Sequence, residues 1–132
     1  MKRVAVLQSN YLPWKGYFDI VHDVDLFIFY DDLQYTKNDW RNRNKLKTAK
    51  GATWLTIPVG AHIHRRICDV ELDDPSWQPK HWQAMSDWYA TTPHFDRYAK
   101  FFAELTAPMF TRSQKAGFLW GNAGIAQLVQ SG

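Results

Sequence analysis

Residues 3–30 read RVAVLQSNYLPWKGYFDIVHDVDLFIFY, and this segment sets the expected topology. It begins and ends with short aliphatic and aromatic runs, Arg3–Leu7 and Leu26–Tyr30, which predict two buried strands. Between the strands, apolar residues recur at helical spacing, namely Tyr17, Ile20, Val21 and Val24. A crossover through a helix makes such strands parallel, so residues 8 and 31 should leave the same carboxyl edge of one sheet. Open α/β sheets bind their ligands at that edge.

Two alternating runs farther along the chain predict a hairpin. Apolar residues occupy alternate positions in residues 54–59 and again in residues 68–72. Pro58 places the first run at a sheet edge or at the end of a strand, because proline cannot donate a ladder hydrogen bond. We expect the two runs to pair across a loop of residues 60–66.

Two helices should follow the hairpin. Ser76 is expected to cap the first helix, and Thr92 with Pro93 to begin the second. Apolar stripes mark both helices, through Trp82, Met85 and Trp88 or Tyr89 in the first and through Phe95, Tyr98, Phe102 and Leu105 in the second. The expected class is therefore α/β: a βαβ-type start with a small mixed sheet, parallel in its first strands and with a later hairpin, followed by two helices.

The composition predicts one soluble domain with a real core. The chain has 132 residues, of which 45% are hydrophobic and 16% aromatic, and this excludes a disordered chain. Its single cysteine excludes an internal disulfide. No secretory signal peptide opens the sequence, and no apolar run reaches the roughly 18 to 20 residues that span a bilayer. We therefore expect a cytoplasmic protein.

Positive charge is concentrated in one short segment. Residues 1–35 contain three basic and five acidic side chains, whereas residues 36–50 contain six basic and one acidic. The remaining residues balance, so residues 36–50 carry all of the positive excess. Such a block either attracts phosphate or nucleic acid or forms a solvated loop, and the sequence leaves both readings open.

The loop after the first strand combines amides, aromatic rings, a lysine and a glycine. Amides and rings orient and stack a polar ring such as a sugar or a base, and a helix N-terminus favours an anion. Gly16 would let a ligand approach backbone N–H groups, and Lys15 adds a point charge for phosphate. The same residues could instead form a structural loop with inward-facing rings. The binding candidates are Asn10, Tyr11, Lys15, Gly16 and Tyr17, with Gln8 at the strand end as a catalytic candidate.

Two aspartates follow the second predicted strand. Successive strand residues face opposite ways, so at most one of Asp31 and Asp32 should point into a cleft. Neighbouring carboxylates supply a general base or bind a cation, and they are equally common as solvated turn residues. Gln34 and Tyr35 follow as further candidates for substrate contact.

Residues 40–45 read WRNRNK, directly beyond that edge. Arginine forks recognise phosphate or carboxylate in bidentate fashion, and asparagines between them can complete the hydrogen bonding around an oxygen-rich ligand. The binding candidates here are Trp40, Arg41, Asn42, Arg43 and Asn44.

Other chemistries find little support in the sequence. His62 and His64 would share one side of a strand and His81 could join them, but the adjacent arginines would repel a cation, and we predict no metal site. Cys68 alternates with polar residues and is interpreted as a small core residue. No P-loop, dinucleotide fingerprint or Ser/His/Asp arrangement occurs, so no cofactor is predicted.

Together these motifs resemble the WbqC-like family of bacterial proteins. They are VLQSNYLPWKGYFDI at residues 6–20, FYDDLQY at residues 29–35 and WRNRNK at residues 40–45, with a looser likeness through WLTIPV at residues 54–59 and on to about residue 105. Ser9 stands where many relatives have proline. Because family members are considerably longer, we expect residues 1–106 to form an incomplete WbqC-like N-terminal domain and residues 107–132 a divergent or truncated tail.

The resemblance implies a role in bacterial surface polysaccharide and O-antigen (lipopolysaccharide) biosynthesis. We hypothesise a transferase that acts on a nucleotide-activated sugar or amino sugar, with this small molecule and no nucleic acid as its partner. The roles would fall on Asp31 or Asp32 as general base, on Gln8 and Gln34 as orienting groups, and on Arg41 and Arg43 as phosphate ligands.

A second hypothesis is a non-catalytic nucleotide or nucleic-acid binding module. It would use the basic residues 36–50, with Tyr35 and Trp40 as stacking rings. The order of strand, Pro/Gly loop, helix and strand also matches nucleotidylyltransferase-like folds, whose paired histidines are missing here. The donor, the acceptor, the reaction and the oligomeric state stay open at this level.

Overall fold

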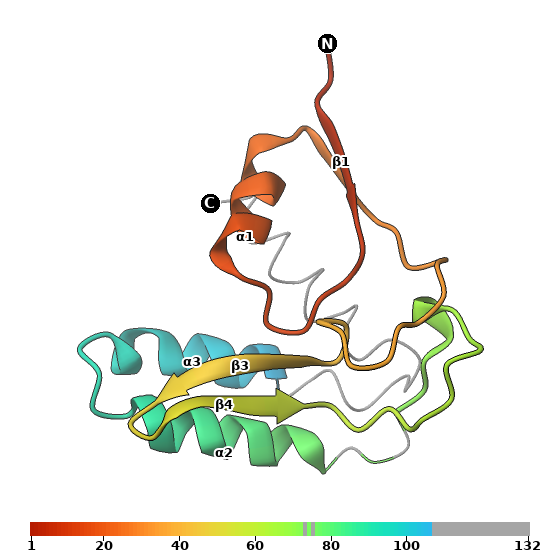
Figure 1. The fold of residues 1–132 in the computed structure, drawn as a ribbon. Coiled ribbons are helices and arrows are strands. Elements are labelled where there is room, and N and C mark those ends of the chain that lie inside the picture. The colour runs from red at the N-terminus through yellow and green to blue at the C-terminus, as the bar shows by residue number, and fades with distance from the viewer. Residues whose placement is uncertain (73, 75, 107–132) are drawn as a thin grey trace.

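A computed structural model describes residues 1–72, 74 and 76–106 of the chain. Figure 1 shows two lobes, one built from β1, α1 and β2 and the other from the β3–β4 hairpin with α2 and α3. The predicted mixture of a parallel strand pair, a hairpin and two later helices is confirmed, and the strands form two separate two-stranded sheets. Within the described residues, no helix is long and apolar enough to cross a membrane. The predicted tail of residues 107–132 lies outside the described residues.

The first lobe is the predicted strand–helix–strand unit. β1 (Val4–Leu7) and β2 (Leu26–Phe29) are parallel and in register from the first residue of each to the last. α1 (Lys15–Asp23) covers one face of this pair, where its Tyr17 and Val21 pack against apolar side chains of both strands. The prediction that these strands are buried is wrong for the opposite face, because nothing in the described residues covers it.

The second sheet corrects the predicted hairpin. β3 (Arg43–Thr48) pairs antiparallel with β4 (Gly51–Thr56) across a two-residue turn at residues 49–50. Gly51, which follows the turn, has a φ of 107°, which suits glycine. Residues 68–72 were expected to pair with β4, but Ile67–Asp69 forms a 3-10 helix, η1, instead. The basic segment therefore contains a strand. Lys45 and Lys47 of β3 face outward on either side of Leu46, which is partly buried. Because the exposed positions are charged, the alternation of a strand was not recognised in the sequence.

The two predicted helices are present. α2 spans Trp77–Tyr89 and α3 spans Phe95–Thr106. Ser76 precedes α2 as expected, although its side chain accepts no capping hydrogen bond from the first turn. The end of α2 is fixed to the hairpin because the Tyr89 hydroxyl donates to the Lys47 carbonyl over 2.7 Å.

The main core is formed by residues that precede and follow the hairpin in the chain. It consists of Tyr35, Ile57, Val59, Ile67, Val70, Leu72 and Trp77, with Tyr11 packed against it. Cys68 was expected in this core but is only partly buried, with its Sγ atom 3.8 Å from a carboxylate oxygen of Asp32. The η1 turn rotates Cys68 outward, where a strand would have placed it beside Val70. This partial burial raises the pKa of the Cys68 thiol.

Candidate functional site

The carboxyl ends of β1 and β2 meet through one buried carboxylate. Asp31 is only 4% exposed and accepts hydrogen bonds from the Ser9 backbone N–H (2.9 Å) and the Ser9 hydroxyl (2.6 Å). Asp32 points the other way, is exposed, and pairs with Arg66 at 3.2 Å. The residue that meets Asp31 is thus Ser9, which sequence reasoning missed, and the neighbouring Gln8 contributes its backbone carbonyl to another contact.

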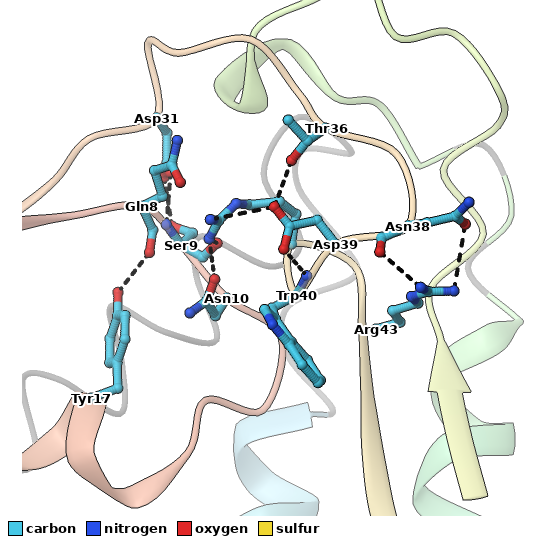
Figure 2. Close-up of polar contacts among 11 residues, drawn as sticks. Gln8, Ser9, Asn10, Tyr17, Asp31, Thr36, Asn38, Asp39, Trp40 and Arg43 are labelled. Atoms are coloured by element: carbon cyan, nitrogen blue, oxygen red, sulfur yellow. Dashed lines mark hydrogen bonds and ion pairs between the residues drawn. The ribbon is translucent and has the colours of Figure 1, made fainter.

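A guanidinium extends this network to the basic segment (Figure 2). Arg41 donates to the Ser9 carbonyl over 3.0 Å and also to the Asn10 side-chain oxygen, and it lies 3.7 Å from an oxygen of Asp39. Asp39 in turn accepts from the Thr36 hydroxyl and the Trp40 backbone N–H, each over 2.7 Å. We call Ser9, Asp31, Asp39 and Arg41 the edge network.

The acidity of Asp39 follows from these contacts. Burial alone would raise the pKa of Asp39, but hydrogen bonds from Thr36 and Trp40, with the charges of Arg41 and Arg43, hold it below its usual value. Asp39 is therefore a carboxylate at neutral pH, and it partly neutralises Arg41.

The loop after β1 and the start of α1 are each fixed by a tyrosine. The Tyr17 hydroxyl donates to the Gln8 carbonyl over 3.2 Å, and the Tyr11 hydroxyl lies 2.7 Å from Nδ1 of His81 on α2. Burial raises the pKa of both phenols, and for Tyr17 the Asp31 charge adds to that rise. Neither ring offers its hydroxyl to a ligand in this arrangement.

Two further contacts shape the same loop. Asn44 of β3 donates to the Leu12 carbonyl over 2.6 Å, and Leu12 has a left-handed φ of 46° directly before Pro13. The Trp14 indole, 69% exposed, lies over Gly16, where a Cβ atom would overlap the ring. The approach that Gly16 was expected to offer is occupied by Trp14, while Lys15 extends into solvent.

A pocket of about 250 Å³ lies at the base of the hairpin, and we call it the hairpin-base pocket. Its lining comprises Tyr35, Lys37, Asn38, Asn42, Arg43, Thr56, Ile57, Pro58, Val59 and Gly60. Three of these, Tyr35, Asn42 and Arg43, are predicted site residues. Lys37 and Asn38 were missed, although the charge excess of residues 36–50 pointed at their segment.

Two residues of the pocket lining each have a buried polar atom without a partner among the described residues. Asn42 donates from Nδ2 to the Ile57 carbonyl over 2.9 Å, which leaves its Oδ1 unmatched. Arg43 donates from its terminal nitrogen to the Asn38 carbonyl over 2.7 Å, which leaves its Nε unmatched. Buried polar groups without partners are destabilising, so a bound molecule able to reach them would stabilise the pocket.

The outward face of the hairpin carries rings and cations beside the pocket. The guanidinium carbon of Arg43 lies 4.3 Å from the Trp54 ring centre, and the Lys45 ammonium lies 4.8 Å from it. Trp40 tilts against Trp54 with ring centres 5.8 Å apart, and both indoles remain substantially exposed. Arg43 thus belongs both to this face and to the hairpin-base pocket.

The predicted site residues therefore divide into three groups. Those whose side chains are engaged inside the protein are Asn10, Tyr11, Tyr17, Asp31, Arg41 and Asn44, and Gln8 joins them through its backbone carbonyl alone. Those that line the pocket are Tyr35, Asn42 and Arg43. The exposed remainder is Lys15, Asp32, Gln34 and Trp40, with Gly16 covered by Trp14. The catalytic and binding roles assigned to all of these residues stay predictions.

Histidines make no metal centre in the described part of the chain. The rings of His62 and His64 lie 6.2 Å apart on the exposed loop, while His81 is buried against Tyr11 and Trp77. No group of three or more His, Cys, Asp or Glu side chains that could bind a metal occurs among the described residues.

Comparison with known proteins identifies the family. The WbqC-like protein family model matches residues 8–115, somewhat farther than the motifs suggested. An uncharacterized protein of Mycobacterium tuberculosis (strain ATCC 25618 / H37Rv), Rv1507c, is 47% identical over 107 residues, which is 80% of this chain and 46% of that protein. The chain thus spans less than half the length of this relative, and no solved structure matches it. The chain belongs to the WbqC-like protein family.

Proposed function

We propose that this chain binds the sugar-phosphate part of a nucleotide-activated sugar, as part of a transferase of bacterial surface polysaccharide (O-antigen) biosynthesis. The observation that carries the proposal is the hairpin-base pocket, which is lined by Lys37, Asn42 and Arg43; a buried acceptor of Asn42 and a buried donor of Arg43 lack partners among the described residues. A sugar phosphate offers both a hydroxyl that donates and oxygens that accept. The polysaccharide association of WbqC-like proteins supports the choice of a sugar.

The charge and size of the pocket fit this ligand class. Lys37 and Arg43 supply positive charge, and Arg43 is positioned by its bonds to Asn38 and its stacking on Trp54. A volume of about 250 Å³ suits one sugar or phosphate group rather than a whole nucleotide sugar. The nucleoside would then extend from the pocket towards the exposed indoles beside it.

Of the two aspartates predicted as general base, we favour Asp32. Its carboxylate is exposed and pairs with Arg66 at the surface, whereas both oxygens of the buried Asp31 accept hydrogen bonds from Ser9. Asp31 and Arg41 would then act as positioning residues. Gln8 remains the candidate for orienting the sugar from the β1 end.

Calorimetric titration with a panel of nucleoside diphosphate sugars tests the proposal. Lys37→Ala and Arg43→Ala should each weaken binding roughly ten-fold, as expected for the loss of one charged hydrogen bond. Lys50→Ala is the matched control, because Lys50 is an exposed cation of the same segment outside the pocket lining, and it should leave affinity unchanged. Absence of binding to every member of the panel, or equal losses in all three variants, would contradict the proposal.

The outward hairpin face favours one second candidate, single-stranded nucleic acid. Exposed indoles of Trp40 and Trp54 beside Arg43 and Lys45 combine stacking surface with positive charge. This candidate predicts oligonucleotide affinity that falls steeply with salt and that is weakened by Lys45→Ala, although Lys45 does not line the pocket. Binding that is insensitive to salt would eliminate it.

A further inference from the structure

One face of the parallel strand pair is apolar and open. Alternate residues of β1 and β2 turn towards α1, and the others, Val4, Val6, Leu26 and Ile28, face away from it and are 41% to 51% exposed. The register places Val4 beside Leu26 and Val6 beside Ile28, so the four side chains form one continuous patch. We call this patch the open sheet face.

The charges around the open sheet face lie at its end. Arg3 pairs with Asp23 at 3.0 Å, and its backbone N–H donates to Asp25 over 2.8 Å, at the amino end of the strands. No strand position from 4 to 7 or from 26 to 29 carries a charged side chain. The patch therefore has the composition of an interior surface with a polar rim.

Such a face is unusual for parallel strands. Parallel sheets are normally covered on both faces, and two strands alone are marginally stable in water. Within the described residues, β1 and β2 pair only with each other, so both outer edges of this sheet also lack a partner strand. An apolar face with two open edges fits a polypeptide that covers the face and adds main-chain hydrogen bonds at an edge.

We propose that the open sheet face binds a polypeptide layer equivalent to the part of the longer WbqC-like relative that lies outside the match. More than half of that relative has no counterpart in the 107 matched residues, which is ample chain for another layer of the sheet. A second copy of this chain fits less well. Four half-exposed side chains provide far less than the roughly 800 Å² that each partner buries in a stable interface between separate chains, whereas a layer that is continuous with the domain, as in the longer relative, needs no such area.

Cysteine labelling compares this chain with the intact relative. Ile28→Cys is made here in a Cys68→Ser background, and the aligned position of the M. tuberculosis protein is changed in the same way. Ile63→Cys, on an exposed loop, is the matched control in both proteins. We expect fast labelling at position 28 in this chain, labelling slower by about 100-fold or more at the aligned position of the relative, as local burial requires, and fast labelling at both controls.

Each other outcome overturns the proposal. Equally fast labelling at position 28 in both proteins would mean that no layer of the relative covers this face. Slow labelling in this chain that speeds up on dilution would assign the face to a second copy. Slow labelling here at every concentration would mean that the chain covers its own face.

A second measurement keeps the proposal testable if cysteine disturbs either fold. Ile28→Lys should leave the melting temperature of this chain nearly unchanged, because the side chain already meets solvent. The aligned lysine substitution should lower the melting temperature of the relative by several degrees, since it would bury a charge. Equal shifts in the two proteins would contradict a covered face. The result is independent of nucleotide-sugar binding, so the two proposals fail separately.

Discussion

The edge network and the hairpin-base pocket contain similar residues and use them differently. At the sheet edge, Asp31 accepts two hydrogen bonds from Ser9, and Arg41 is engaged with loop carbonyl and side-chain oxygens. At the base of the hairpin, Asn42 and Arg43 leave buried polar atoms without partners in the described chain. The Nε atom of each arginine is buried without a partner among the described residues, so the two differ in place: Arg41 is bonded to the loop after β1, and Arg43 lines the hairpin-base pocket. Polar side chains bonded to distant parts of the chain stabilise the fold, whereas polar side chains in the lining of a pocket are placed to bind a ligand.

The largest expected effect is on Asp31. Asp31→Ala would remove a buried carboxylate and leave the Ser9 backbone N–H without an acceptor, so the free energy of unfolding should fall by roughly 3 kcal/mol in urea titrations. Asp32→Ala is the control, since losing an exposed ion pair with Arg66 should change stability by less than about 1 kcal/mol. Equal effects of the two substitutions would remove the distinction between the inward and the outward aspartate.

The two arginines give the sharpest test of the comparison. Arg41→Ala should lower the free energy of unfolding by about 2 kcal/mol, because it removes hydrogen bonds to the β1 loop. Arg43→Ala should lower it by less than about 1 kcal/mol, because its stacking on Trp54 and its bonds to Asn38 are at the surface. Urea denaturation of both variants measures the difference. A larger loss for Arg43 would assign it to the structure rather than to the ligand.

The two asparagines should differ in the same direction by a smaller amount. Asn42→Ala loses one bond to the Ile57 carbonyl but also removes an unmatched oxygen, so about 1 kcal/mol is expected. Asn44→Ala loses contacts to Leu12 and Tyr11 and should cost about 2 kcal/mol. Thermal unfolding of both variants gives the order. The reverse order would mean that the Asn42 oxygen has a partner.

The smallest expected effect is a pH dependence of stability that comes from His81, which lies outside both the edge network and the hairpin-base pocket. Burial lowers the pKa of His81 below its usual value near 6.5, even though a hydrogen bond with the Thr56 backbone acts in the opposite direction. As the pH falls, His81 is therefore protonated in the unfolded chain before it is protonated in the folded chain. Stability from neutral His81 is present above pH 6.5 and is lost as the pH falls towards the lower folded value. Unfolding curves from pH 7.5 to 5 should show this loss, and His81→Gln should flatten it.

The sequence predicted the parallel unit well because its information is local. Apolar runs on either side of a helical period leave few topologies for residues 3–30, and the structure has the expected parallel pair. β3 was missed because lysines occupy its outward positions, and a charged alternation resembles a solvated loop. The pairing of β4 with residues 68–72 failed for the same reason, since the true partner had not been recognised as a strand.

The site was only partly predictable, because the task of a polar side chain depends on its partners. Strand parity required the two aspartates to diverge, but it could not say which one would meet Ser9. Ser9 itself carries no signal, being a small polar residue in a polar loop. Arg41 and Arg43 look equivalent in sequence, and only the spatial arrangement separates them.

The contact from Asn44 to the Leu12 carbonyl has a consequence for the order of folding. Leu12 adopts a left-handed conformation that costs about 1 kcal/mol for a residue of its kind, and its bonding partner is 32 positions later in the chain. Hairpins form within about 1–10 μs, faster than contacts between distant segments. We expect the β3–β4 ribbon to close first and to act as a template on which the earlier loop then takes its shape. Slowing that ribbon would delay a part of the protein that was synthesised before it.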